Sequence, residues 1–220
     1  MRAFKFKLHC VALGAAILGF SMIATAQAQG LTGTALIGAL RQGGYVIVMR
    51  HTSSPREIPS KAVANPDNVT PERQLDETGR TTARAMGVAV KALGIPLGDV
   101  LSSPTYRARE MLKIAGLTKY KTVPELDEPA SGMSMAGPGS SKSGAWLKAK
   151  AAEPPRAGTD TLIVSHVPNI VGAFTPEVKS LADGEALVLR PDGKGAAAIV
   201  AHIKIEEWPQ LASMAASHNY

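Results

Sequence analysis

The pattern of apolar and polar positions predicts strands that alternate with helices along the chain. Short apolar runs are typical of buried strands, and the segments between them carry apolar residues at helical spacing. The expected strands are 45–49, 99–104, 121–123, 161–166, 185–189 and 196–205. Helices are expected over 32–41, over 78–93, from about 107 and around 146–147. This alternation predicts an α/β fold, a three-layer α/β/α sandwich with a central, mostly parallel sheet.

The first 28 residues have a different pattern. Three basic residues precede an uncharged, mostly apolar run over 11–24, which is shorter than the roughly 20 residues of a membrane span. Ala26-Gln27-Ala28 then fits the small-x-small pattern of a signal-peptidase site, and Ala24-Thr25-Ala26 offers a second one. We expect a signal peptide over 1–28, cleaved to leave a single domain over 29–220 in the periplasm or secreted. An uncleaved N-terminal anchor is the alternative.

Removal of this segment changes the charge and the cysteine content. The whole chain has 24 basic and 18 acidic residues, and without the three basic residues of the signal segment 21 remain against 18, a net charge of +3. Such a mild excess without a long basic run gives little support for a nucleic-acid partner. Cys10, the one cysteine of the sequence, is removed as well, so the mature chain is expected to contain neither a disulfide nor a nucleophilic thiol.

Basic side chains follow three of the expected strands. Arg50 and His51 end the first strand, Arg107 comes within one turn after the second, and His166 ends the fourth. For Arg50-His51 alone, a solvated strand exit is the simpler interpretation. However, the carboxyl ends of parallel strands share one edge of a sheet, so these four side chains can converge. Two guanidiniums and two imidazoles at one place predict a site for a dianion such as phosphate.

The chain resembles the histidine phosphatase superfamily, also called phosphoglycerate-mutase-like, and in particular its exported branch-1-type phosphatases. The resemblance is carried by four motifs, Val48-Met49-Arg50-His51, Leu75-Asp76-Glu77-Thr78-Gly79-Arg80, Leu101-Ser102-Ser103-Pro104-Thr105-Tyr106-Arg107-Ala108 and Ile163-Val164-Ser165-His166. It implies the phosphoglycerate-mutase-like fold, with His51 as the nucleophile that takes the phosphoryl group. It also implies that Arg50, Arg107 and His166 hold the non-bridging oxygens, with neither a metal nor another cofactor.

The chain departs from the family pattern at several positions. Thr52 replaces the glycine that usually follows the nucleophile, Val167 follows the second histidine, and Met111 replaces a threonine. Because no aspartate follows His166, the resemblance places the proton donor in the Leu-x-Glu segment after the third strand, at Glu128. Glu125 and Asp127 are close alternatives.

We therefore expect an exported, metal-independent phosphomonoesterase that forms a phosphohistidine. The alternatives are a non-catalytic phosphate-binding module on the same fold and a phosphomutase. The expected substrate is a phosphorylated small molecule, envelope glycan or peptide, with specificity residing in 53–72 and 131–143. No stable membrane anchor is expected after cleavage. His202 and His218 lack a partner motif, so we interpret them as structural or solvated.

Overall fold

The apolar runs form the strands of one sheet in the computed structural model, which describes residues 30–127 and 142–217. The strands are β1 (Val46–Arg50), β2 (Leu97–Ser102), β3 (Lys121–Thr122), β4 (Asp160–Ser165), β5 (Ala186–Pro191) and β6 (Ala197–Ile203). The helices are α1 (Gly33–Gln42), α2 (Glu77–Leu93), α3 (Tyr106–Ile114), α4 (Lys142–Ala151), α5 (Val167–Phe174) and α6 (Glu207–Ser217), with a 3₁₀ turn, η1, over Pro124–Leu126.

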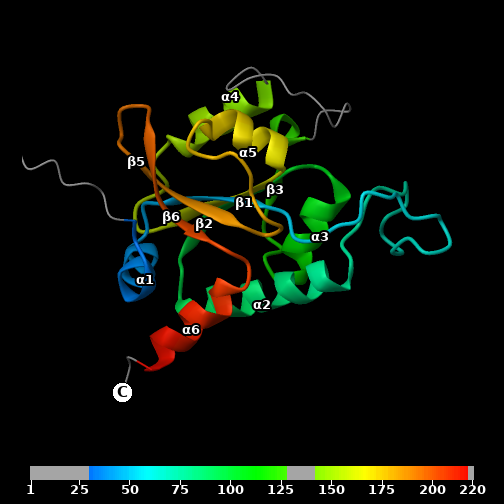
Figure 1. Ribbon diagram of the computed structural model, residues 1–220, viewed down its shortest axis with the longest axis horizontal. Coiled ribbons are helices and arrows are strands. Elements are labelled where there is room, and N and C mark those ends of the chain that lie inside the picture. The colour runs from blue at the N-terminus through cyan, green and yellow to red at the C-terminus, as the bar shows by residue number, and fades with distance from the viewer. Residues whose placement is uncertain (1–29, 128–141, 218–220) are drawn as a thin grey trace, which may run out of the picture.

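The sheet has the strand order β3-β2-β4-β1-β5-β6. β1 pairs in parallel with β4, which pairs in parallel with β2, whereas β5 is antiparallel to β1 and β6 to β5. Because β1, β2 and β4 run in the same direction, their carboxyl ends meet at one edge of the sheet (Figure 1). The predicted three-layer α/β/α sandwich with a mostly parallel sheet is confirmed.

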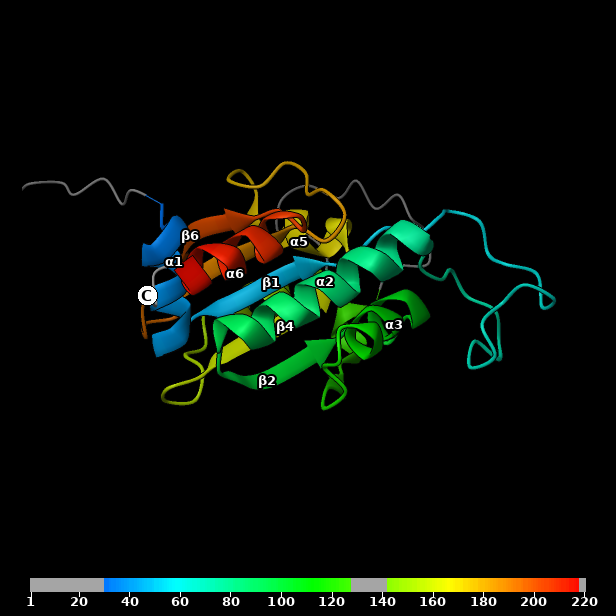
Figure 2. The ribbon, with the colours of Figure 1, turned by 90° about the horizontal axis from the view of Figure 1, so that it is seen from below.

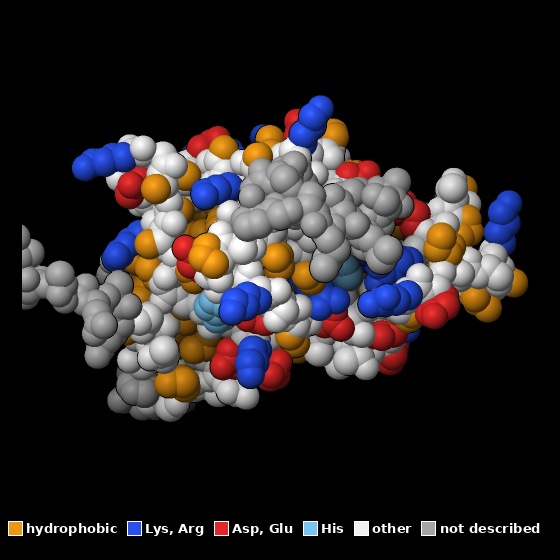
Figure 3. All heavy atoms as spheres, turned by 45° about the horizontal axis from the view of Figure 1, so that its top comes forward, with side chains coloured by type: hydrophobic (Ala, Val, Ile, Leu, Met, Phe, Trp, Pro, Cys, Tyr) orange, Lys and Arg blue, Asp and Glu red, His pale blue; other side chains and the backbone are white. Residues whose placement is uncertain are grey.

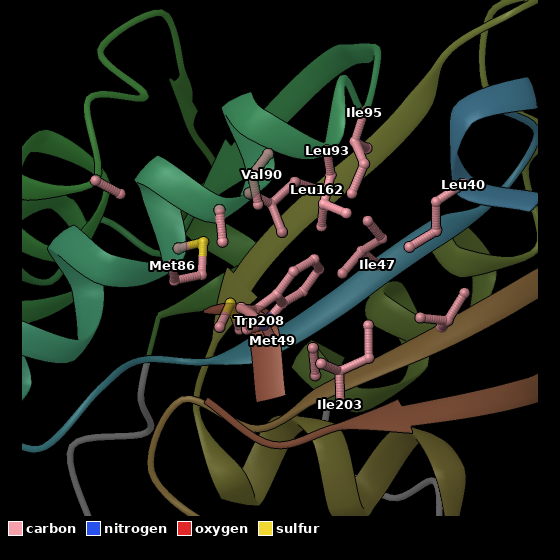
Figure 4. Close-up of a cluster of buried hydrophobic side chains, with 14 of the residues drawn as sticks. Leu40, Ile47, Met49, Met86, Val90, Leu93, Ile95, Leu162, Ile203 and Trp208 are labelled. Atoms are coloured by element: carbon pink, nitrogen blue, oxygen red, sulfur yellow. The ribbon is translucent and has the colours of Figure 1, made fainter. Parts of the chain in front are cut away.

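Successive residues of each strand contribute to different cores. On β1, Ile47 and Met49 pack toward α1, α2, α3 and α6, and Val46 and Val48 pack toward α4 and α5. Figure 2 shows α2 and α6 lying across one face of the sheet, and Figure 4 shows the cluster in which Trp208 of α6 contacts that face. β1 is therefore enclosed on both faces, which explains its uninterrupted apolar sequence.

Some boundaries differ from those predicted. β2 begins at Leu97, two residues early, because Leu97 already pairs with Asp160. β3 ends at Thr122, although the backbone N–H of Val123 still donates to Ser102 O at 2.9 Å. Thr32 has the extended backbone of an N-cap, but its side chain makes no capping hydrogen bond.

Two helices were not predicted. α5 is an eight-residue helix that follows β4 directly and has proline in its first turn. α6 buries Trp208, Leu211 and Ala215 against the core, a helical spacing that the sequence already contains. Of the residues that the structure describes, no helix is long and apolar enough to cross a membrane. The expected signal peptide over 1–28 lies outside them.

Candidate active site

His51 follows β1 directly, at the carboxyl edge of the sheet. Backbone hydrogen bonds hold it from both neighbouring segments. The N–H of His51 donates to Ser165 O of β4 at 3.2 Å, and its carbonyl accepts from the N–H of Gly184 at 3.1 Å. Arg50 is tied in the same way, because its N–H donates to Glu185 O at 3.0 Å. The side chain of His51 is thus fixed by sheet pairing and by the segment that precedes β5.

The structure brings together three of the predicted site residues, namely His51, Arg107 and His166. Arg107 Nε donates to His51 Nε2 at 3.1 Å, and Arg107 Nη2 lies 3.1 Å from His166 Nδ1. The two imidazole rings are 5.2 Å apart, edge to face, and all three side chains are buried. Arg107 reaches this position from the first turn of α3, whereas His166 is the N-cap residue of α5.

The hydrogen bonds fix which nitrogen of each imidazole carries a proton. His51 Nδ1 lies 2.8 Å from the carbonyl of Thr52, which can only accept, so Nδ1 carries the proton and Nε2 has the lone pair. Arginine can only donate, so His166 Nδ1 is the acceptor and its Nε2 donates to Ser103 Oγ at 2.8 Å. Both imidazoles are therefore neutral in this arrangement, with their lone pairs directed at Arg107.

Burial lowers the pKa of both histidines. Desolvation is the largest cause for His51, and the positive charges of Arg107, Arg50 and Arg73 add to it, which brings the pKa from 6.5 to about 3. The same causes, with burial again the largest, lower the pKa of His166 to about 2. His51 is thus a neutral imidazole, with its lone pair on Nε2, at every pH near neutrality.

These lowered pKa values make the stability of the fold depend on pH. Between about pH 6.5 and pH 3 the unfolded chain protonates both histidines and the folded chain does not, so the free energy of unfolding falls as the pH falls. Each histidine contributes a slope of up to about 1.4 kcal/mol per pH unit. We expect His166→Gln to remove about that much slope, as measured by urea unfolding between pH 4 and pH 6.

The pH dependence of the free energy of unfolding has to be compared between His166→Gln and the unchanged protein, because other groups titrate in the same pH range. Burial raises the pKa of Asp160 to about 6, and this works in the opposite direction, since a raised pKa adds stability at low pH. A His166→Gln protein with an unchanged slope would show that His166 is protonated to the same extent in the folded and unfolded chain.

Arg50 lies in the wall of the same cavity, but its guanidinium has other partners. Arg50 Nη2 forms an ion pair with Asp183 Oδ1 at 2.6 Å, and Nη1 donates to Leu181 O at 2.7 Å. The side chain is one-quarter exposed. Two of its N–H groups are thus used to hold the segment before β5, and the remaining ones are available to a ligand.

The cavity at this edge has a volume of about 320 Å³ and is lined by Arg50, His51, Arg56, Arg73, His166, Val167 and Pro168. Arg56 and Arg73 were not among the predicted site residues. Both belong to the long polar segment between β1 and α2, which projects from the body of the molecule in Figures 1 and 2. Figure 3 shows Lys and Arg side chains gathered beside a histidine on this side of the molecule.

The predicted proton donor, Glu128, lies outside the described residues. Its alternatives Glu125 and Asp127 are exposed and do not line the cavity. The backbone before Glu128 is nevertheless held at the site, because Asn169 Nδ2 lies 3.1 Å from both Leu126 O and Asp127 O. Asn169, in the first turn of α5, is a positioning residue that the sequence did not reveal.

The departures from the family pattern have different consequences. Thr52 is fully buried and does not line the cavity, and its hydroxyl has no hydrogen-bond partner among the described residues. Val167 does line the cavity. Met111, on α3, is buried in the core. Of these three substitutions, only Val167 adds bulk next to a ligand.

The remaining histidines lie away from this cluster or outside the description. His202 is on β6, half exposed, with its Nδ1 3.0 Å from Glu185 Oε1. His218 lies outside the described residues. Within 30–127 and 142–217 no group of three or more His, Cys, Asp or Glu side chains is arranged to hold a metal ion.

The arrangement of strands and helices matches the phosphoglycerate-mutase-like fold of several solved structures. The solved structure of the protein histidine phosphatase SixA complexed with tungstate matches with a TM-score of 0.53 and 20% identity, covering 74% of this chain and 98% of that one. The phosphoserine phosphatase of Entamoeba histolytica, in complex with 3-phosphoglyceric acid, matches with a TM-score of 0.50 and 16% identity, over 73% and 96% of the two chains.

A third match is the product of the open reading frame Rv3214 of Mycobacterium tuberculosis, with a TM-score of 0.50 and 18% identity over 72% of this chain and 96% of that one. No family model matches the sequence, and no curated protein matches it either. At these identities the likeness shows the fold, and the chemistry has to be argued from the site.

Proposed function

We propose that this protein is a phosphomonoesterase that works through a phosphohistidine at His51. The observation that carries the proposal is the hydrogen-bonding of His51. Its Nδ1 proton is held by the Thr52 carbonyl, so the lone pair is on Nε2, 3.1 Å from the buried guanidinium of Arg107. A neutral nucleophile beside a fixed positive charge is what phosphoryl transfer requires.

In the first step, His51 Nε2 attacks the phosphorus in line with the ester oxygen. The N–P bond forms as the P–O ester bond breaks, and the leaving oxygen takes a proton from Glu128. Arg107 and Arg50 donate to two of the non-bridging oxygens, and Arg107 Nε thereby releases the lone pair of His51 Nε2. His166 donates to the third oxygen from Nδ1 after its proton moves there from Nε2, which then accepts from Ser103 Oγ. Arg73 adds positive charge from the wall of the cavity. The imidazole becomes positively charged, which the Thr52 carbonyl stabilises through the Nδ1–H hydrogen bond.

In the second step, a water molecule attacks the phosphohistidine and passes a proton to the Glu128 carboxylate. The N–P bond breaks, inorganic phosphate leaves and His51 recovers its lone pair. We propose no metal for either step, because arginines supply the positive charge that a metal ion supplies in other phosphoryl-transfer enzymes.

Release of phosphate from p-nitrophenyl phosphate tests this function and separates it from the non-catalytic alternative. We expect turnover that is unchanged, within about twofold, after incubation with EDTA and removal of the chelator. Loss of turnover in EDTA that magnesium or zinc restores would contradict metal independence. Binding of phosphate without any turnover would favour a phosphate-binding module.

The role of Glu128 predicts different effects on two kinds of ester. An alkyl phosphate expels a strongly basic alkoxide, so a well-placed acid contributes about a hundred- to ten-thousand-fold, whereas p-nitrophenolate needs little protonation. We expect Glu128→Gln to reduce turnover of an alkyl ester steeply and to spare the aryl ester. Glu125→Gln and Asp127→Asn serve as matched controls. Equal, small effects of Glu128→Gln on both esters would place the donor elsewhere.

We further propose that the protein is exported through the segment 1–28 and acts in the periplasm or outside the cell. Its substrate would then be a phosphorylated small molecule, envelope glycan or peptide. The basic n-region and the small-x-small site support export, and N-terminal sequencing of the mature protein would locate the cleavage.

A further inference from the structure

We propose that Arg56 forms a second anion subsite in the wall of the cavity, and that the substrate therefore carries an anionic oxygen group on its leaving group in addition to the phosphate. This inference rests on the proposed function, because it concerns the leaving group of the same phosphate ester. The group can be a carboxylate or a second phosphate, since a guanidinium binds both in the same way.

Arg56 is available to such a group. It lines the cavity together with His51 and His166, and its side chain is exposed. Within the described part of the chain it has neither a hydrogen bond nor an ion pair. Arg50, in contrast, is paired with Asp183. The charge of Arg56 is therefore not neutralised by any described residue.

The backbone that precedes Arg56 is held firmly against the start of α2. Arg73 Nε donates to Pro55 O at 2.7 Å and Arg73 Nη2 to Ser54 O at 2.9 Å. Ser53 Oγ donates to Asp76 Oδ2 at 2.6 Å, and Ser53 O accepts from the N–H of Asp76 at 3.2 Å. These bonds hold the backbone up to Pro55 before any ligand binds, which lowers the entropic cost of ordering this segment on binding.

Gly79 is required for this arrangement. A Cβ atom added at Gly79 would lie 2.1 Å from the carbonyl oxygen of Ser53, so only glycine lets α2 approach the segment this closely. Gly79 belongs to the motif that runs from Leu75 to Arg80. Its close approach to Ser53 links this motif to the segment that carries Arg56.

Arg56 is one of three arginines in the wall of the cavity, together with Arg50 and Arg73. The cavity of about 320 Å³ corresponds to about ten water molecules at roughly 30 Å³ each, whereas a phosphate group has only five heavy atoms. Part of the cavity therefore remains for the leaving group, and Arg56 lies in its wall.

The described lining of the cavity favours an anionic leaving group. None of the described lining residues is acidic, and five of the seven are arginine or histidine residues. A leaving group with a carboxylate would thus meet positive charge and no repulsion from these residues. An uncharged leaving group would gain nothing from Arg56.

Binding of phosphonates tests the subsite independently of turnover, because the P–C bond is not hydrolysed. The ligands are 3-phosphonopropionate and 4-phosphonobutyrate, each compared by calorimetry with its uncharged amide, which has the same shape. For at least one of the two lengths, we expect the carboxylate to bind about tenfold more tightly than the amide, an effect that weakens as salt is added. In Arg56→Gln that preference should disappear, while binding of the amide changes less than about twofold.

Arg190→Gln is the matched control. Arg190 is exposed on β5, whose pairing with β1 places it beyond Val46, at the opposite end of the strand from the site. We expect it to bind all four ligands like the unchanged protein.

Equal binding of carboxylate and amide at both lengths, or a preference that persists in Arg56→Gln, would overturn the subsite. Failure of every phosphonate to bind would overturn the subsite and the phosphate cavity together. Phosphonate binding without turnover of any ester would contradict the proposed function alone.

Discussion

Replacing His51 with alanine is expected to lower the turnover of p-nitrophenyl phosphate by a factor of at least about 10⁴ while the protein still binds phosphate. The loss is large because the variant lacks the nucleophile, and loss of a catalytic nucleophile is among the most severe effects known for single substitutions. Binding persists because Arg107, Arg73 and Arg50 remain. Steady-state kinetics and calorimetry with inorganic phosphate measure the two effects separately.

His202→Gln is the control for this experiment. It removes a half-exposed histidine of β6, and glutamine can keep the hydrogen bond to Glu185. We expect turnover within about twofold of the unchanged protein. A His51→Ala protein whose turnover falls by less than tenfold would show that the phosphoryl group is attacked by another group, such as water.

Substitution of Arg107 by glutamine should have the second largest effect. Arg107 lies within hydrogen-bond distance of both imidazoles, and in the proposed mechanism its guanidinium faces the negative charge that develops on the transferred phosphoryl group. Loss of one such donor typically costs about a hundred- to a thousand-fold in turnover. We expect a fall of at least that size, and only partial recovery in Arg107→Lys, because the compact ammonium of lysine lacks the planar fork of N–H donors that matches two phosphate oxygens.

The pKa of His51 gives a second measurement of the role of Arg107. If Arg107 had only a structural role, its replacement would leave this pKa unchanged. The charge of Arg107 lowers the pKa of His51, so Arg107→Gln should raise that pKa, as followed by NMR of the imidazole protons. Arg109→Gln, two residues along the same helix, is the control for both measurements. An unchanged pKa of His51, or a fall in turnover equal to that in Arg109→Gln, would contradict the proposed role.

The convergence of His51, Arg107 and His166 could be predicted from the sequence because it depends on topology alone. Each residue follows a buried parallel strand, and the carboxyl ends of such strands necessarily meet at one edge. The apolar runs are strong signals since both faces of the sheet are covered. The same reasoning placed Arg50 in the wall of the cavity, but it did not reveal the ion pair with Asp183.

Arg56 and Arg73 could not be found in this way. They lie on a long polar segment whose path is set by hydrogen bonds between residues far apart in the sequence, such as Asn65 Nδ2 to Glu110 Oε1 at 2.8 Å. No periodicity encodes such contacts. Asn169 was missed for a related reason, because a buried asparagine shows its role only when its partners, the carbonyls of Leu126 and Asp127, are known.

α6 is a different case. The positions of Trp208, Leu211 and Ala215 follow the helical period, so the pattern was present in the sequence. Proline at 209 and the polar residues that follow obscured it, although proline is well tolerated in the first turn of a helix. The packing of Trp208 against the sheet confirms that this segment belongs to the core (Figure 4).

The most direct test of the proposed chemistry is to trap the phosphoryl group on the protein. Enzyme mixed with labelled p-nitrophenyl phosphate would be quenched in alkali during turnover, digested and analysed by mass spectrometry. We expect the label on the peptide that contains His51, stable in alkali and released by acid, and we expect none in His51→Ala. Turnover without label on that peptide, or label that persists in His51→Ala, would contradict a phosphohistidine at His51.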